Sequence, residues 1–215
     1  SYPEGIDDEL INLVANEPKV AKYFDIPIQH ISNKILKKMN RKTNKEEIIS
    51  LIKKIREKIP NVTLRTSLIV GFPGETEEDF NELLEFVKNA KFEKLGTFMY
   101  SKEEGTPAAL LPDQIHGNTK KARYNKIMKE QQKISKENLL KKLNKKYEIL
   151  IEDISFDGKY YIGRTMQDVP EIDGIVYVKN DKPGKNNLIG KFVECEIKEV
   201  SNYDLIANYI KTIEK

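Results

Sequence analysis

A glycine-containing segment between a hydrophobic run and an acidic one is the first place where this sequence offers chemistry. It reads LIVGFPGETEEDF over residues 68–80. Gly71 and Gly74 let the backbone approach a ligand closely, and the helix expected beyond them would direct a partial positive charge at that ligand. A structural strand-to-helix turn is an equal alternative on local chemistry, because the segment lacks the lysine of a nucleotide-binding loop.

Two further loops place polar side chains after predicted strands. Gln29, His30, Ser32 and Asn33 follow a short run of β-prone residues and offer hydrogen bonds suited to a ribose or an amino-acid ligand, although we expect Ser32 to cap the next helix. The segment SKEEGTPA at 101–108 is read as a solvated acidic loop rather than as a source of general acids. Three polar loops at successive strand ends together predict one shared pocket.

Arg65 stands inside the apolar run VTLRTSLIV, where a cation must find an anion. Strand alternation places it on the face opposite Leu64 and Thr66. It either faces a ligand or pairs with an acidic residue of a neighbouring strand, and without further context the ion pair is favoured.

A long polar loop near the C-terminus reads GRTMQDVPEIDG over residues 163–174. It presents Arg164, Asp168, Glu171 and Asp173 around a proline. A plain hairpin loop is the alternative, but this length and polarity suit recognition of a partner.

Composition excludes several classes of site. The 215 residues carry a net charge of +3 and include one cysteine, Cys195, which leaves no disulfide framework, no Cys-x-x-Cys zinc site and no ligand set for an iron–sulfur cluster. His30 and His116 lie far apart in the sequence, so we expect no metal site. No apolar run is long enough for a membrane helix, and a cytoplasmic location is the default expectation.

The positive charge is concentrated in one segment. Residues 119–142 contain nine basic and two acidic residues, a net +7, whereas residues 143–215 carry −2. The charge therefore belongs to a single predicted helix.

The elements that must position these residues alternate between strands and helices. Strands are predicted at 23–28, 62–70 and 95–100, the second of them apolar enough to be buried on both faces. Capping boxes are predicted at Thr43 with Glu46 and at Thr76 with Asp79, each opening a helix. This order predicts parallel βα units, and since three strands are too few for a complete sheet or barrel, we expect neighbours upstream of residue 1.

The pattern changes after residue 143, where about five short strand candidates are separated by turn residues. They predict a small antiparallel barrel of the oligonucleotide-binding general type. We therefore expect two domains, 1–142 and 143–215.

Five segments, in this order, resemble one family: DIPIQHIS, LRTSLIVGFPGETEEDF, YSKEEGTPA, LPDQ and GRTMQDVPEIDG. They are similar to the radical S-adenosylmethionine methylthiotransferases, specifically the RimO type, which modifies the β-carbon of an aspartate in small-subunit ribosomal protein twelve. The resemblance implies an α/β fold made of the C-terminal half of a partial (β/α) radical-SAM barrel followed by an OB-like TRAM domain.

The resemblance also implies S-adenosylmethionine contacts. Gln29 would lie near the ribose or methionyl part, Arg65 would face the same ligand, and Phe98 would present backbone and apolar surface to the adenine. The full implied set is Gln29, Arg65, Gly71, Gly74, Glu75, Phe98 and Met99. Substrate recognition is assigned to Arg164, Asp168, Glu171 and Asp173.

The family depends on two 4Fe-4S clusters whose cysteines are absent here. One is held by a Cys-x-x-x-Cys-x-x-Cys loop and the other by three further cysteines, and Cys195 matches neither set. We therefore interpret the chain as a C-terminal fragment that contains no catalytic residue and is inactive alone.

The implied partner is a small-subunit ribosomal protein, which is basic and suits the acidic residues 143–215. The basic helix at 119–142 offers a contact to ribosomal RNA. Two alternatives stay open: a tRNA methylthiotransferase with the same chemistry, and a non-catalytic module that binds RNA or the ribosome.

Overall fold

The computed structural model describes residues 2–180 and 188–214. The chain divides into two compact units, residues 1–134 and 135–215. The division falls inside the long helix α5, whereas the domain boundary expected from the sequence lies after residue 142. No helix in the described part of the chain is long and apolar enough to cross a membrane.

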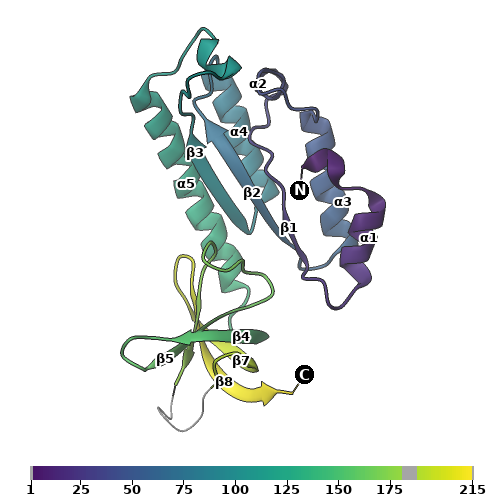
Figure 1. The fold of residues 1–215 in the computed structure, drawn as a ribbon, viewed down its shortest axis with the longest axis vertical. Helices are drawn as coiled ribbons and strands as arrows, with labels where there is room; N and C mark the ends of the chain where they lie inside the picture. Colours follow the sequence, from purple (N-terminus) through teal and green to yellow (C-terminus); the bar gives the residue numbers. More distant parts are fainter. Residues whose placement is uncertain (1, 181–187, 215) are drawn as a thin grey trace. The chain divides into compact units, whose positions relative to one another are not determined.

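The first unit contains a three-stranded parallel sheet with the order β1-β2-β3 (Figure 1). Its elements are η1 (Pro3–Gly5), α1 (Asp8–Asn16), β1 (Tyr23–Asp25), α2 (Asn33–Lys38), α3 (Lys45–Lys58), β2 (Thr63–Val70), α4 (Glu77–Ala90), β3 (Lys94–Met99), η2 (Pro107–Leu110) and α5 (Gly117–Leu140). The predicted parallel βα units of a half-barrel are thereby confirmed.

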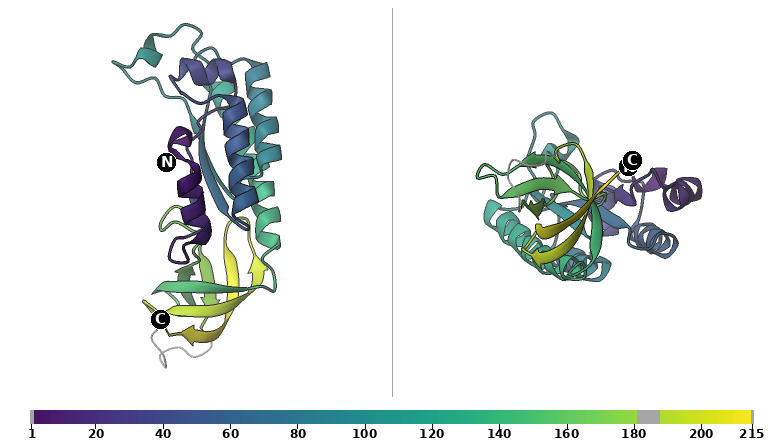
Figure 2. Two further views of the ribbon diagram at one scale, coloured as in Figure 1. Left: turned by 90° about the vertical axis from the view of Figure 1, so that its right-hand side faces the viewer. Right: turned by 90° about the horizontal axis from the view of Figure 1, so that it is seen from below.

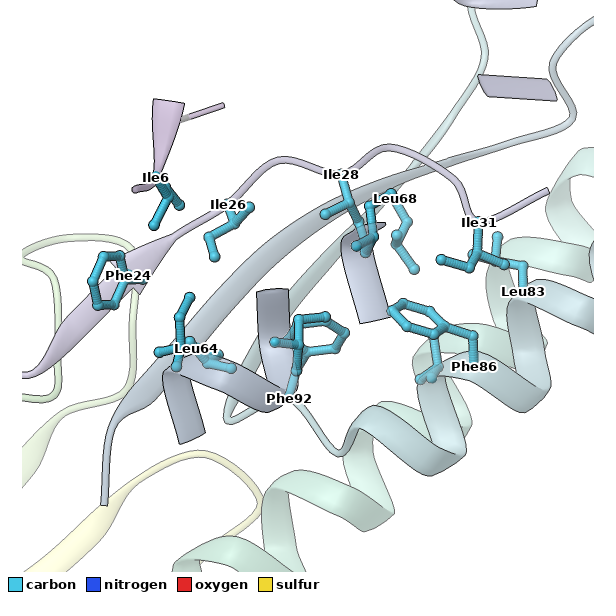
Figure 3. Close-up of a cluster of buried hydrophobic side chains, with 14 of the residues drawn as sticks. Ile6, Phe24, Ile26, Ile28, Ile31, Leu64, Leu68, Leu83, Phe86 and Phe92 are labelled. Carbon is cyan, nitrogen blue, oxygen red and sulfur yellow. The ribbon is translucent and has the colours of Figure 1, made fainter. Parts of the chain in front are cut away.

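One face of this sheet carries the core of the unit. Leu64 and Leu68 are fully buried from β2, and Phe86 and Phe92 pack in the same cluster (Figure 3). Helices α3, α4 and α5 lie along one side of the sheet (Figure 2). Ile127 of α5 belongs to the same cluster, so the basic helix is fastened to the sheet by an apolar stripe.

The prediction that β2 is buried on both faces is wrong. Its residues alternate between buried and partly exposed positions from Leu64 to Val70, with Arg65, Ser67 and Ile69 partly exposed. Among the described residues the helices cover one face only, which leaves the other face to line a ligand site.

The N-cap of α4 lies where the sequence predicts it, and that of α3 lies one residue later. Thr76 caps α4 and forms the predicted reciprocal pair with Asp79. At α3, the predicted box of Thr43 and Glu46 is wrong by one residue, because Asn44 caps the helix and Glu47 returns the bond. Asparagine is as good an N-cap as threonine, and both registers carry a glutamate at the required spacing.

The second unit is a closed five-stranded barrel with the order β4-β5-β6-β8-β7. The strands are β4 (Lys146–Ile154), β5 (Tyr160–Arg164), β6 (Val176–Lys179), β7 (Phe192–Val200) and β8 (Leu205–Ile213). The small five-stranded barrel is as predicted, but β6 and β8 pair in parallel, so the barrel is not antiparallel throughout. Closure removes the sheet edges that would otherwise be left unpaired.

Cys195 of β7 points into the barrel core, where it is fully buried between the backbone partners Tyr147 and Tyr209. Burial raises the pKa of its thiol to about 12, and the charge of Glu194 adds to the rise. The thiol is therefore a packing group in the folded protein and neither a nucleophile nor a ligand.

We expect Cys195 to react slowly with a thiol reagent in the native protein and rapidly after denaturation, because only the thiolate attacks and it is suppressed in the core. Since the sequence contains no other cysteine, the absorbance change reports this thiol alone. The control is Phe156→Cys, which places a thiol at a fully exposed position and should react without denaturant. Equal native rates for the two thiols would contradict the buried placement.

Candidate functional site

The GFPGE loop follows β2 and has a backbone that requires its glycines. Gly71 and Gly74 adopt φ of 73° and 78°, in the left-handed region. A Cβ on Gly71 would overlap the side chain of Lys120, and a Cβ on Gly74 would overlap that of Lys38. Two lysines from different helices thus lie directly against this loop.

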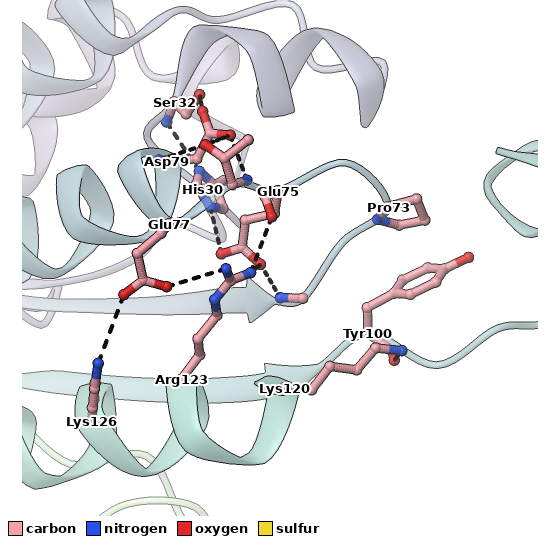
Figure 4. Close-up of polar contacts among 12 residues, drawn as sticks. His30, Ser32, Pro73, Glu75, Glu77, Asp79, Tyr100, Lys120, Arg123 and Lys126 are labelled. Atoms are coloured by element: carbon pink, nitrogen blue, oxygen red, sulfur yellow. Dashed lines mark hydrogen bonds and ion pairs between the residues drawn. The ribbon is translucent and has the colours of Figure 1, made fainter. Parts of the chain in front are cut away.

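A buried carboxylate, that of Glu75, holds the loop in place (Figure 4). Its Oε2 accepts two hydrogen bonds, one from the backbone N–H of Gly71 and one from Arg123 Nη1 at 3.0 Å. The other oxygen lies 3.4 Å from His30 Nε2. The side chains of Glu75 and His30 are fully buried, and that of Arg123 is 7% exposed. A buried charge of this kind is tolerated only when it is paired and hydrogen-bonded, as it is here.

The hydrogen bonds of His30 settle which ring nitrogen carries its proton. Nδ1 lies 3.0 Å from the backbone N–H of Ser32 and accepts from it. The proton of the ring therefore sits on Nε2, which donates to Glu75. His30 thereby connects the segment after β1 to the loop after β2.

Arg123 brings α5 into the same network. Its Nη1 also donates to the backbone oxygen of Glu75 at 3.2 Å, and its Nη2 to Glu77 at 3.4 Å. The guanidinium lies over the ring of Phe80, 5.5 Å from its centroid. From the sequence, Arg123 was counted only as part of a basic helix, although its four-residue spacing from Ile127 on the apolar face was a signal that it is buried.

Asp79 forms a second polar cluster beside this one. Ser32 Oγ donates to it at 2.7 Å, Thr76 donates from backbone N–H and hydroxyl, and Lys34 pairs with it. Burial alone would raise its pKa, but the bonds from Lys34, Thr76 and Ser32 outweigh burial and lower the pKa to about 2. Ser32 occupies the predicted N-cap position of α2, but its hydroxyl donates to Asp79 and makes no capping bond to the helix backbone.

A pocket of about 330 Å³ opens at the carboxyl ends of β1 and β2. Gln29, Ile69 and Phe72 line it together with residues 38–41 and 106–108. Ligands of parallel α/β folds bind at this edge of the sheet, and the volume lies at the lower end of the range for small-molecule sites. The three polar loops predicted to share a pocket all contribute to it or border it.

The residues predicted to bind the cofactor do not all line the pocket. Gln29 lines the pocket, and Ile69 pairs with Phe98 across the sheet. Arg65 forms an ion pair with Asp25 at 2.6 Å, the alternative favoured from the sequence. Phe98 and Met99 are both exposed, and strand alternation sends their side chains to opposite faces.

The predicted recognition loop of the second unit is held together by its own acids. Asp168 accepts hydrogen bonds from the backbone and hydroxyl of Thr165, and Asp173 accepts one from the backbone N–H of Val169. Arg164 pairs with Glu152 at 2.8 Å. Glu171 is exposed in a left-handed conformation, φ 63°, and is the member of the predicted set that faces solvent.

The described residues fit S-adenosylmethionine, but they do not fit an iron–sulfur cluster. The pocket is lined by polar and apolar groups together, Gln29 and Asn40 beside Ile69 and Phe72, and this mixture fits a ligand of the nucleoside class. The single cysteine is buried in the barrel, and the described residues contain no cluster of three metal-ligating side chains. An iron–sulfur cluster therefore has no ligands in this part of the chain.

Comparison with known proteins agrees with this geometry. The model of the radical SAM superfamily matches residues 2–87, and that of the TRAM domain matches residues 145–210. A protein of Alkaliphilus oremlandii named ribosomal protein uS12 methylthiotransferase RimO is 56% identical over 95% of this chain and 46% of its own length. Proteins with the same name from Clostridium perfringens and Geobacter sulfurreducens are 51% and 47% identical.

The fold, the site and these matches define a radical SAM protein that carries a TRAM domain, a class that uses S-adenosylmethionine and iron–sulfur chemistry. Within that class, the relatives that this chain matches at 47–56% identity are named as methylthiotransferases of the RimO type. It spans about half the length of the curated relatives that it matches.

We expect Asp79→Asn to lower the free energy of unfolding by about 2 kcal/mol near neutral pH, because a carboxylate with a depressed pKa stabilises the fold while it is ionised. This stabilisation is complete above about pH 4, the ordinary carboxyl range, and is lost as the pH falls through about 2.

Urea denaturation followed by circular dichroism at several pH values measures the difference between the two proteins. Glu85→Gln is the matched control on the exposed side of α4, where its pair with Lys88 contributes little. A difference between wild type and Asp79→Asn that does not shrink on acidification would refute the role given to this carboxylate.

Proposed function

We propose that this chain supplies the S-adenosylmethionine-binding half-barrel and the TRAM domain of an enzyme that methylthiolates the β-carbon of an aspartate in ribosomal protein uS12. The observation that carries the proposal is the pocket at the carboxyl ends of β1 and β2, bordered by the GFPGE loop that Glu75 fixes in place. The names of the relatives give the substrate protein.

S-adenosylmethionine bound to an iron–sulfur cluster would supply a radical able to remove hydrogen from an unactivated carbon. The residues of this chain are proposed to bind S-adenosylmethionine and to orient it. Gln29 and the backbone around Gly71 and Gly74 are proposed to hold the nucleoside part, and Phe98 to give apolar surface to the adenine from the exposed face of β3. Arg65, paired with Asp25, would face the methionyl part.

The clusters are proposed to be held by segments that the relatives carry beyond the matched half, since this chain contains one buried cysteine. The chain alone is therefore expected to be inactive. We use the name "extended protein" for this chain joined to those segments, at the full length of its relatives.

Two surfaces are proposed to meet the ribosomal substrate. Residues 143–215 carry a net −2, which suits a basic ribosomal protein and disfavours a grip on tRNA phosphates. Glu171, at the exposed part of the loop 163–174, is the recognition residue best placed for contact. Residues 119–142, with a net +7, would contact ribosomal RNA nearby, and the reaction is placed in the cytoplasm.

The extended protein, reconstituted with iron and sulfide, should transfer a methylthio group to the aspartate of uS12 when it is given S-adenosylmethionine, a one-electron reductant, small ribosomal subunits and tRNA together. Mass spectrometry of the protein and the RNA identifies which molecule gains the group. Modification of tRNA with none on uS12 would show that the alternative substrate is the correct one.

Gly71→Ala should abolish most of this transfer, because its Cβ would overlap the Lys120 side chain and displace the loop. Gly158→Ala is the matched control. It has the same left-handed backbone, φ 69°, but open space around the added Cβ, and so it carries the backbone strain without disturbing the pocket. Equal losses in both variants would attribute the effect to backbone strain and contradict the role given to the loop.

A further inference from the structure

The pocket at the carboxyl ends of β1 and β2 has an unbalanced charge. Its lining includes the cations Lys38 and Arg41 and no carboxylate. A larger groove of about 550 Å³ between α3 and α4 is lined by three basic and three acidic side chains, so it is neutral in formal charge. Of these two, the pocket at the carboxyl ends of β1 and β2 is the one whose charge favours an anionic ligand.

We propose that Lys38 and Arg41 form a carboxylate-binding subsite that takes the side chain of the aspartate to be modified. The inference rests on the proposed function and adds to it the residues that select an acidic target. The groove between α3 and α4 offers no such subsite, because its charges are already compensated.

The two cations have free hydrogen-bonding capacity. Lys38 Nζ lies 3.5 Å from the backbone oxygen of Pro73, in the GFPGE loop, and the guanidinium of Arg41 packs over the ring of Tyr2, 5.1 Å from its centroid. Within residues 2–180 and 188–214 neither side chain forms an ion pair. An arginine fork beside a lysine is well suited to a carboxylate, which accepts two parallel N–H bonds from the fork and one from the ammonium.

Two residues that line the pocket, Gln29 and Asn40, have a left-handed backbone. Gln29 adopts φ of 67°. Its backbone N–H donates to the Ser67 oxygen at 2.9 Å, and its backbone oxygen accepts from the N–H of Ile69 at 2.8 Å. Asn40, which also lines the pocket, adopts φ of 56°. Non-glycine residues held in this region cost free energy and concentrate at ligand sites. Asn40 lines the pocket together with Lys38 and Arg41, and its side chain carries an amide N–H group of the kind that a carboxylate accepts from.

A carboxylate could reach this pocket from two sources, the substrate aspartate or the methionyl group of S-adenosylmethionine. Two peptides separate them, one with the uS12 target sequence and one in which asparagine replaces the target aspartate. Asparagine keeps the size and shape of aspartate and removes the charge, so only a subsite for the side-chain carboxylate distinguishes the two.

The test uses the extended protein with Arg41→Met and Lys38→Met, and fluorescence anisotropy of each labelled peptide. We expect each variant to bind the aspartate peptide roughly tenfold more weakly, as for loss of a hydrogen bond to a charged group, and to bind the asparagine peptide as the wild type does. The affinity for S-adenosylmethionine, measured separately by calorimetry, should not change. Lys37→Met is the matched control, because Lys37 is the exposed neighbour on α2 outside the pocket lining.

Each other outcome overturns the inference. Equal weakening for both peptides would show a general effect on the mouth of the pocket, and weaker binding of S-adenosylmethionine would assign the cations to the cofactor. Wild-type protein that modifies uS12 but binds both peptides equally would overturn the subsite and leave the proposed function intact. Modification of tRNA, with no binding of either peptide, would mark the failure of the proposed function itself.

Discussion

The carboxylate of Glu75 is the interaction on which the rest of the site depends. It is buried, and its oxygens meet three segments that are distant in the sequence: His30 after β1, the N–H of Gly71 after β2, and Arg123 on α5. A buried carboxylate with these partners has one stable position, because the loss of any partner leaves a charge without compensation. The glycine loop therefore has a defined backbone before any ligand arrives, which reduces the entropy cost of binding.

This rigidity explains why the pocket beside the loop offers polar groups in fixed directions. Lys38 and Lys120 lie where side chains on Gly74 and Gly71 would stand. The absence of a Cβ at these two positions therefore leaves room for the lysine side chains and also permits the left-handed backbone. Lys120 is bonded to the backbone oxygen of Tyr100 at 2.8 Å and serves the structure. In the described part of the chain, Lys38 Nζ has one hydrogen-bond partner, the Pro73 oxygen at 3.5 Å, and stays available to a ligand. The two lysines thus have the same relation to the loop and different capacities for function.

Much of the architecture was predictable because it follows from periodicity and turn chemistry. The parallel βα units, the cap at Thr76 and the five short strands are all local signals. The site was predictable in part, since glycines mark the loop and strand ends mark the pocket. Arg123 was missed because its partner Glu75 is distant in sequence; its spacing from Ile127 places it on the apolar face of the helix but does not identify that partner. The parallel pairing of β6 with β8 depends on barrel closure, which no local pattern encodes.

The most direct test of the role given to Glu75 is the amide hydrogen exchange of Gly71, whose N–H is bonded to this carboxylate. We predict that Glu75→Leu speeds this exchange greatly and that Glu75→Gln, which keeps an acceptor oxygen, speeds it less. The amide of Gly74, bonded to the backbone oxygen of Asp113 at 3.0 Å, is the reference within the same loop and should be less affected. Unchanged protection of the Gly71 amide in Glu75→Leu would contradict the claim that this carboxylate fixes the loop.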